Sequence, residues 1–180
     1  MNCSDILKAQ QKCKFVQNYD PQCTCETISV SNDSPKIVED EERLIRQIYS
    51  PIHIDEETGN IKPLAFNDVK DKGMSVNRKT YCSKEELLRK IQSKLNLDKK
   101  RGKDRTFFGA IQAICHDIRS IKTDDDRRAF CVYDTANKNN VSHADICQAF
   151  SGRVQESKVR AKLRKIFSKT PVGLDDLFEN

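Results

Sequence analysis

The stretch "RRAFCVYDT" (residues 127–135) decides the fold, because it carries the clearest strand signal in the chain. Its side chains alternate, and it contains Phe, Val and Tyr, residue types that favour strands. "MSVNR" (residues 74–78) predicts a second, short extended segment. Residues 52–66 have period-two character on both sides of a Glu-Thr-Gly-Asn turn, which is typical of a hairpin. We therefore predict a small sheet that contains the 127–135 strand.

Outward from this strand, apolar residues recur at helical spacing. The pattern predicts helices over residues 38–48, 84–95, 107–118, 143–150 and 155–168. Ser83 and Glu86 form a capping box for the second of these helices, and Ser142 with Asp145 forms a shorter version for the fourth. The predicted fold class is α+β and helix-rich: a single compact domain with a small sheet and an N-terminal arm.

A change in composition divides the chain at Pro35. Residues 1–34 combine a short amphipathic helix with a loop rich in Asn, Asp, Ser and Pro, which predicts a Cys-containing N-terminal arm. Residues 35–180 form the predicted α+β domain, which carries a basic C-terminal helix. The sequence has no long apolar run and no basic start followed by an apolar segment. We therefore expect a cytoplasmic protein that does not enter a membrane.

The chain contains eight cysteines, and in the cytoplasm we expect all of them to be reduced. Four lie in the N-terminal arm with the spacing Cys-x9-Cys-x9-Cys-x-Cys, and these are Cys3, Cys13, Cys23 and Cys25. Four thiolates can hold a zinc ion, although the CxxC knuckles of structural zinc sites are absent from this sequence. No cofactor is expected, and zinc on these four cysteines stands as the alternative.

Positive charge is concentrated in the C-terminal half of the chain. The net charge is +5, and residues 84–180 carry 21 Lys and Arg against 14 Asp and Glu. The excess lies in a loop at 99–105 and on the outer face of 158–169. Lys and Arg bind phosphates regardless of base sequence, so both segments predict contact with nucleic acid. The predicted contact residues are Lys99, Lys100, Arg101, Lys103, Arg105, Arg160 and Arg164.

Two His–carboxylate pairs are the candidates for catalysis. In "NNVSHADICQAF" (residues 139–150), His143 lies in the first turn of a predicted helix, where the helix dipole keeps imidazole neutral as a base or metal ligand. Asp145 follows two residues later and can orient the ring. His53 and Asp55 share one face of an extended segment. Each pair also has a structural interpretation: the first pair as an ordinary helix start, and the second as a solvated strand edge.

Four short motifs follow one another over about residues 40 to 148: "RLIRQIYSPIHI", "KPLAFND", "MSVNR" and "NNVSHADI". Their order resembles a group of small bacterial proteins with the pattern Arg-x-Ile-x-x-Pro, Ala-Phe, Ser-Val and Asn-x-x-His-Ala. The chain departs from that pattern where 62–64 replaces small hydroxyl residues and 141–142 replaces Pro-Ala. The resemblance implies no particular activity. It implies a bacterial or phage-related cytosolic origin, and it implies that His143 shares a surface with Arg43 or Arg46.

The usual motifs of nucleophilic and phosphate-loop enzymes are missing from this sequence. It has no Gly-x-Ser-x-Gly elbow, no Gly-rich phosphate loop, no HExxH and no CxxC. We therefore expect a small non-catalytic accessory component of a multi-protein bacterial system, which binds a protein partner and, as a further ligand, nucleic acid. The alternative is a hydrolase or nuclease that uses His143 as base or metal ligand. Convergence of His53, His143 and an acidic residue in one cleft would favour that alternative.

Overall fold

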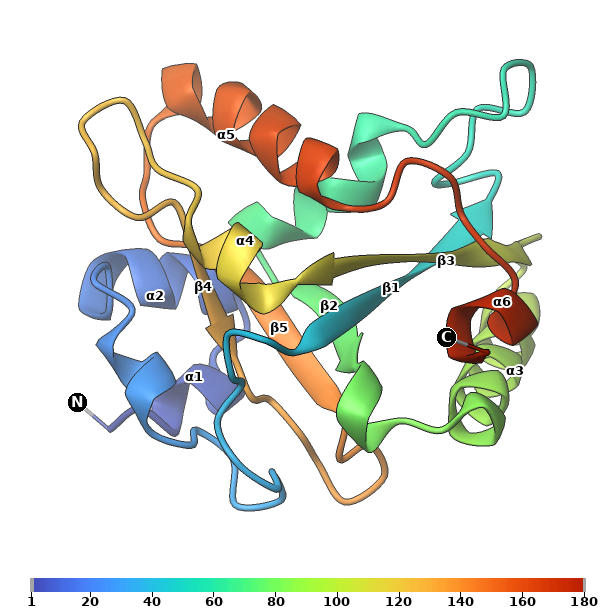
Figure 1. Cartoon of the computed structure of the whole chain (residues 1–180), viewed down its shortest axis with the longest axis horizontal. Helices are drawn as coiled ribbons and strands as arrows, with labels where there is room; N and C mark the ends of the chain where they lie inside the picture. Colours follow the sequence, from blue (N-terminus) through green and yellow to red (C-terminus); the bar gives the residue numbers. More distant parts are fainter. Residues whose placement is uncertain (1, 180) are drawn as a thin grey trace.

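The computed structural model describes residues 2–179, and its centre is a five-stranded antiparallel sheet (Figure 1). The strands are β1 (Arg43–Ser50), β2 (Met74–Arg78), β3 (Thr106–Ile114), β4 (Phe130–Tyr133) and β5 (His143–Gln148). They lie in the order β3-β1-β2-β5-β4, and each neighbouring pair is antiparallel. The predicted strands at 127–135 and 74–78 are confirmed as β4 and β2.

Short helices and two longer ones surround the sheet. They are α1 (Asp5–Lys8), α2 (Lys12–Tyr19), η1 (Thr24–Thr27), η2 (Pro63–Lys70), η3 (Lys79–Tyr81), α3 (Lys84–Lys100), α4 (Cys115–Arg119), α5 (Arg153–Ile166) and α6 (Leu174–Phe178). The predicted capping box is present at α3, where Ser83 Oγ accepts the N–H of Glu86 at 3.2 Å and the Glu86 carboxylate accepts the N–H of Ser83 at 3.0 Å. The basic C-terminal helix is confirmed as α5.

Two segments predicted as helices belong to strands β1 and β3. The helix prediction for 38–48 is wrong because β1 starts at Arg43 and lies between β3 and β2. Leu44, Ile45 and Ile48 are all fully buried, on a strand whose two faces both pack. A strand that is covered on both faces does not alternate between polar and apolar residues. Its apolar residues can then match helical spacing by coincidence. Residues 107–118 were mispredicted in the same way, since β3 extends to Ile114 before the short α4.

The predicted helix at 143–150 is wrong as well, because these residues form β5. Ala144 and Ile146 point into the main core, while His143 and Asp145 point to the opposite face. Ser142 is not a helix cap: its Oγ accepts hydrogen bonds from Asn77 Nδ2 at 2.9 Å and from Lys90 Nζ at 3.0 Å. Pairing with β2 and β4 overrides the local capping pattern.

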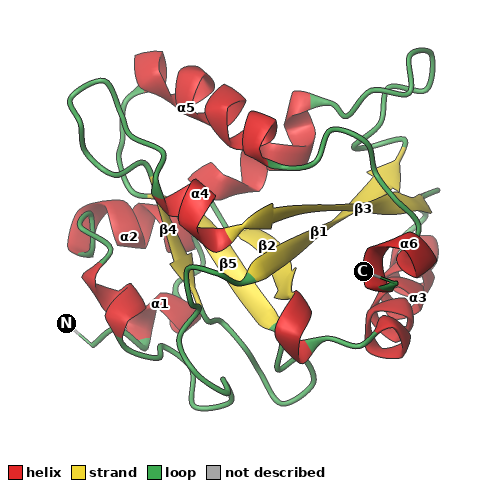
Figure 2. Cartoon of the chain, in the orientation of Figure 1, coloured by secondary structure: helices red, strands yellow, loops and turns green. Residues whose placement is uncertain are grey.

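These corrections change the fold class. The helix-rich prediction is wrong, since three predicted helical segments supply three of the five strands. Figure 2 shows the sheet running through the middle of the molecule with helices around it. The expectation of one compact domain is confirmed. The protein is thus an antiparallel sheet covered by helices rather than a helical domain with a small sheet.

One face of the sheet carries the main core. Helices η2, α4 and α5 cover this face, and Phe66 of η2 packs against Phe167 beyond α5 with ring centroids 5.7 Å apart. Leu44 and Ile48 of β1 point into the same core, together with Leu163 of α5. This continuous apolar layer fixes the sheet from one side.

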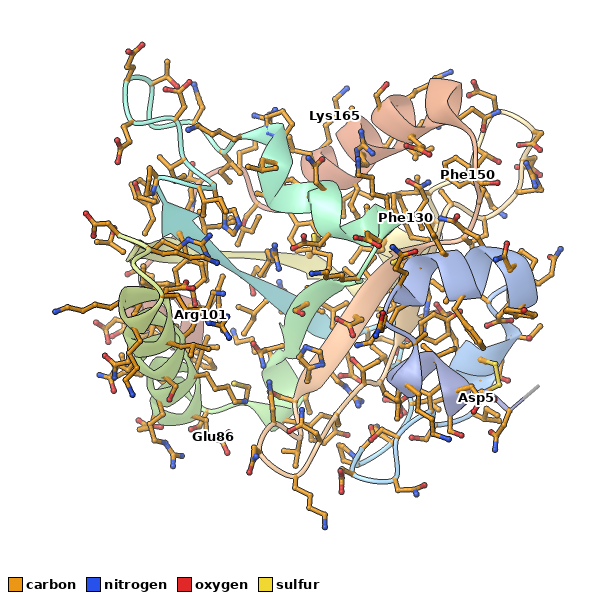
Figure 3. All side chains as sticks on the ribbon, turned by 180° about the vertical axis from the view of Figure 1, so that it is seen from behind. Asp5, Glu86, Arg101, Phe130, Phe150 and Lys165 are labelled. Atoms are coloured by element: carbon orange, nitrogen blue, oxygen red, sulfur yellow. A yellow bond between two sulfur atoms is a disulfide. The ribbon has the colours of Figure 1, made fainter. Side chains whose placement is uncertain are left out.

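The opposite face of the sheet is covered only at its two ends by the described helices. At the β3–β1 end, α3 and α6 pack against Ile45 and Tyr49. At the β5–β4 end, the N-terminal helices pack against Tyr133 and Cys147. Figure 3 views this face, with α3 on one side, α1 and α2 on the other, and strands visible between them. The middle of the face is therefore left for polar side chains.

The N-terminal 34 residues are joined to the sheet by covalent and polar contacts. A disulfide connects Cys23 to Cys131 of β4, and a second connects Cys3 to Cys25. The hydroxyl of Tyr133 donates to Asp20 Oδ2 at 2.8 Å. The structure thus differs from the expectation of eight reduced thiols; Cys13, Cys82, Cys115 and Cys147 are free and buried.

Candidate functional site

A cavity of about 630 Å³ lies on the middle of the less covered face, between α3 and strands β1, β2 and β5. Its volume is typical of sites for small molecules or single units of a polymer. We call it the basic cleft. It is lined by Arg46, Gln47, Tyr49, Ile52, His53, Asp68, Lys72, Ser75, Asn77, Lys90, Lys94, Lys103, Arg105, Asn140 and His143.

The alternation of the strands explains which side chains reach the basic cleft. In β2, Met74 and Val76 point into the main core, so Ser75 and Asn77 point to the other face. In β5, His143 lies directly opposite Asn77 in the antiparallel register. The floor of the basic cleft is therefore a row of polar side chains that neighbouring strands bring together from distant parts of the sequence.

Six cationic side chains surround this floor. Lys90 and Lys94 lie one turn apart on α3, and the remaining four are Arg46, Lys72, Lys103 and Arg105. Lys90 is held in place, since its Nζ donates to Asn140 Oδ1 at 2.6 Å and to Ser142 Oγ at 3.0 Å. Asp68 is the one carboxylate among the lining residues that the structure describes. The lining therefore carries a strong excess of positive charge.

Arg46 is the most enclosed of these cations. Its side chain is 9% exposed, and its guanidinium donates to the carbonyl oxygens of Ser75 and Ala65, both at 3.0 Å. Asp68 Oδ2 accepts from the same guanidinium at 3.2 Å. Burial lowers the pKa of Arg46, and the charge of Asp68 opposes that shift. An arginine stays protonated under such conditions, so the cation is a fixed part of the cleft wall.

Lys94 is affected by its cationic neighbours. Partial burial lowers the pKa of its ammonium group, the carboxylate of Asp98 opposes the shift, and the charges of Arg105, Arg46 and Lys103 lower the pKa further. Its Nζ lies 5.2 Å from the centre of the Tyr49 ring. The lysine is therefore more acidic than an exposed one, because burial and, to a smaller extent, the neighbouring like charges disfavour its charged form.

His143 is oriented by Thr135, at the start of the β4–β5 connection. Its Nδ1 lies 3.1 Å from the carbonyl oxygen of Thr135 and 2.8 Å from Thr135 Oγ1. A carbonyl oxygen only accepts hydrogen bonds, so Nδ1 carries the proton of the neutral ring. The lone pair is then on Nε2, the nitrogen that lies 3.8 Å from Asp145 Oδ1. The ring is half-buried and lines the basic cleft.

His53 is fixed in the opposite tautomer. Its Nδ1 accepts the backbone N–H of Tyr49 at 3.2 Å, so the proton of the neutral ring is on Nε2. Burial and, to a smaller extent, the charges of Arg46, Lys94 and Arg105 together lower the pKa of His53 to about 3. The ring is therefore neutral at physiological pH and presents a hydrogen-bond donor to the cleft.

The pKa of His53 predicts a pH dependence of stability. Between its ordinary value of 6.5 and its folded value of about 3, the unfolded chain binds a proton that the folded protein does not bind. The free energy of unfolding should therefore fall as the pH drops below 6.5, by up to about 1.4 kcal/mol per pH unit from this group. In urea unfolding at pH 7 and pH 5, we expect His53→Gln to lose less stability than wild type. Equal losses in the two proteins would contradict this assignment.

The structure brings several predicted site residues together. His53, His143, Lys103, Arg105 and Arg46 all line the basic cleft, the last as one of the two arginines that the resemblance implied. Asp145 lies next to the His143 ring, and its carboxylate accepts hydrogen bonds from Lys12 Nζ, Ser75 Oγ and Thr135 Oγ1. The acidic residue on the lining is Asp68, which the sequence analysis did not name.

Other predicted site residues lie elsewhere. Asp55 accepts the backbone N–H groups of Glu57 and Thr58, so it stabilises a turn. Lys99, Lys100 and Arg101 are exposed at the end of α3, beyond the cleft itself. Arg160 and Arg164 belong to α5, which Figure 1 places on the opposite side of the molecule from α3. The two predicted nucleic-acid segments therefore do not share a surface.

The four N-terminal cysteines pack in one buried cluster, but among the described residues no group of ligand-type atoms contains all four. Disulfides join Cys3 with Cys25 and Cys23 with Cys131, while the Sγ of Cys13 lies 2.7 Å from that of Cys147. Cys23, Glu26 and Cys131 have ligand-type atoms within 4.8 Å of one another. A metal ion there would require both thiols to be reduced, since the thiolate is the ligand form of cysteine. Zinc at the predicted cysteines stays a prediction.

Several residues of the basic cleft were missed from the sequence. Lys90 and Lys94 carried a usable signal, because an i, i+4 pair of lysines shares one face of a helix that the capping box had already identified. No pattern in the sequence pointed to Lys72, Asn77 or Asn140. They reach the cleft only through strand pairing and the loop before β5.

In the part of the chain that the structure describes, no helix has both the length and the apolar character needed to cross a bilayer. Comparison with known proteins adds no further assignment, since no family model, no curated protein and no solved structure matches this chain. The function must therefore be inferred from the geometry and charge of the basic cleft.

Proposed function

We propose that the protein binds a single strand of nucleic acid, and that the basic cleft holds the phosphates of that strand. The observation that carries the proposal is the charge of the lining, which has six cations and, among its described residues, one carboxylate. Phosphate groups are the anions that clustered Lys and Arg side chains bind most commonly on such surfaces.

The electrostatics of the basic cleft support an anionic ligand. Beside burial, which lowers the pKa of Lys94 most, and the carboxylate of Asp98, which raises it, the charges of Arg105, Arg46 and Lys103 each lower this pKa, so they repel the Lys94 ammonium group. An anion between them would relieve this repulsion, and the gain is larger in a concave site than on a flat surface. Fixed donors such as His53 add directed hydrogen bonds to the phosphate oxygens.

The positive surface continues beyond the cavity, and this extent favours a nucleic-acid strand over a single small anion as the ligand. A second hollow of about 400 Å³ adjoins the basic cleft and shares Lys103 and Arg105 with it. Lys99 lines this second hollow, and Lys100 and Arg101 are exposed nearby. One nucleotide can occupy the cleft while the neighbouring phosphates of the strand lie over the 99–105 loop. Binding of this kind depends on phosphates and not on base stacking.

Fluorescence anisotropy with a labelled single-stranded RNA of about 12 nucleotides tests the proposal. With about five phosphate contacts, the affinity should fall about 100-fold between 50 and 200 mM salt. A labelled DNA strand of the same sequence should bind with a similar salt dependence, because the contacts are to phosphates. Failure to bind either strand at the lower salt concentration, or binding that salt does not weaken, would refute the proposal.

Matched pairs of substitutions locate the binding surface. Lys94→Gln with Lys103→Gln removes two cations from the cleft and should reduce the salt slope by about 1.4. Lys8→Gln with Lys14→Gln makes the same charge change on α1 and α2 and should leave the slope unchanged. Arg160→Gln with Arg164→Gln tests the α5 face. A loss of slope in the α5 variant, without a loss in the cleft variant, would overturn the assignment of the cleft.

A further inference from the structure

The two histidines of the basic cleft are fixed in complementary states. Thr135 accepts the Nδ1 proton of His143, so Nε2 is a proton acceptor, and Tyr49 donates to Nδ1 of His53, so Nε2 is a proton donor. Both rings line the cavity that carries the six cations. A base, a neutral donor and a phosphate-binding lining in one cavity are the parts that phosphoryl transfer requires.

The surroundings of His143 suit a group that gains a proton during a reaction. Asp145 is buried beside the ring, and its Oδ1 lies 3.8 Å from Nε2, the nitrogen that would take up the proton. Its other oxygen, Oδ2, accepts hydrogen bonds from Thr135 Oγ1 at 3.0 Å and from Lys12 Nζ at 2.5 Å. The carboxylate is thus held in place, and it would stabilise the imidazolium that forms when His143 takes up a proton.

We propose that the basic cleft cleaves RNA, with His143 Nε2 as the general base toward a ribose 2′-hydroxyl. This inference rests on the proposed function, because the strand must first bind in the cleft. His143 removes the proton of the 2′-hydroxyl, and the 2′-oxygen forms a bond to the adjacent phosphorus. The bond between phosphorus and the 5′-oxygen of the next nucleotide breaks. The products are a 2′,3′-cyclic phosphate and a free 5′-hydroxyl, and no further reactant is consumed.

The leaving 5′-oxygen needs a proton, and Lys94 is placed to supply it. Its ammonium group lines the same cavity, and burial with the neighbouring cations makes it more acidic than an exposed lysine. Arg46 stays charged and contacts Ser75 and Ala65 through their carbonyl oxygens, so it offers a rigid positive charge for the phosphate. His53 donates a hydrogen bond from a ring that stays neutral.

A strand that is deoxyribose throughout, except for one ribose, tests the reaction. Wild type should cut this strand only on the 3′ side of the ribose, and mass spectrometry should find a cyclic phosphate on the upstream product. An all-deoxyribose strand should bind with similar affinity and stay intact. His143→Ala should bind the ribose-containing strand as wild type does and lose about 10²–10⁴-fold in cleavage rate. Free imidazole added to His143→Ala should restore part of the rate.

Two further variants and three decisive outcomes complete the test. Lys94→Arg keeps the positive charge but cannot release a proton, so binding should persist while cleavage falls. His116→Ala, purified in parallel, changes an exposed histidine of α4 and should cleave as wild type does. Binding without cleavage by wild type would overturn this inference and leave the proposed function intact, as would products with a 5′-phosphate. Absence of binding would refute both proposals together.

Discussion

Replacement of Arg78 by methionine will lower the free energy of unfolding by about 3–5 kcal/mol. Arg78 is fully buried, and its guanidinium forms a two-pronged pair with Glu42, with Nε–Oε2 and Nη2–Oε1 distances of 2.7 and 2.6 Å. It also donates to the carbonyl oxygens of Lys36 at 2.7 Å and Ile37 at 2.9 Å. Methionine fills part of the space but leaves the Glu42 carboxylate buried without its cation, and removing one partner of a buried pair is costly.

Urea unfolding of the variant and wild type measures this effect. Arg101→Met is the matched control, because Arg101 is exposed at the end of α3 and its loss should change stability by less than about 0.5 kcal/mol. A double variant, Arg78→Met with Glu42→Leu, should recover part of the lost stability, since no charge is then left unpaired. A loss below about 1 kcal/mol in the single variant would contradict the buried pair.

Removal of the Cys23–Cys131 disulfide is expected to cost nearly as much. The bond spans 108 positions of sequence. A cross-link that closes a loop of about 100 residues stabilises a protein by about 4.7 kcal/mol in the chain-entropy model, which is above the typical 2–4 kcal/mol and near the upper end of the observed range. Cys3–Cys25 spans 22 positions, so the loss of this bond should cost less, about 3 kcal/mol. Alanine pairs at the two disulfides provide a direct comparison.

In urea without reductant, wild type should have the highest free energy of unfolding. The Cys3→Ala/Cys25→Ala variant should follow, and the Cys23→Ala/Cys131→Ala variant should have the lowest. A thiol titration of the denatured wild-type protein should find the four cysteines that the structure leaves free. That count would also contradict the expectation of a cytoplasmic protein, because disulfides persist mainly in oxidising compartments. Eight titratable thiols, together with variants as stable as wild type without reductant, would show that neither disulfide forms.

The sequence predicted elements best where local signals decide the structure. The capping box at Ser83 and Glu86 identified α3, and aromatic and β-branched residues identified β4. Prediction from the sequence failed at β1, β3 and β5, because pairing with neighbouring strands determines their conformation. The spacing of apolar residues and the apparent capping residues in these segments do not reveal that pairing. Ser142 illustrates the error: a typical cap residue became a hydrogen-bond acceptor for Asn77 and Lys90.

The candidate site was predicted in part for the same reason. His143, His53 and the charged loop at 99–105 stood out by residue type, but their convergence depends on antiparallel pairing between β1, β2 and β5. No helix dipole acts on His143, since this residue begins strand β5 and not a helix. The backbone carbonyl of Thr135 fixes the tautomer instead. The binding of a protein partner and the accessory role remain predictions.

Lysine-reactivity footprinting tests the central claim, that the basic cleft holds a nucleic-acid strand, most directly. The protein is acetylated with and without a saturating all-deoxyribose strand, and mass spectrometry quantifies the modification of each lysine. We predict that the strand protects Lys72, Lys94 and Lys103, which line the cleft. Lys158 and Lys165, on α5, should react equally in both samples. Protection of the α5 lysines, with Lys94 and Lys103 as reactive as in the free protein, would contradict the account.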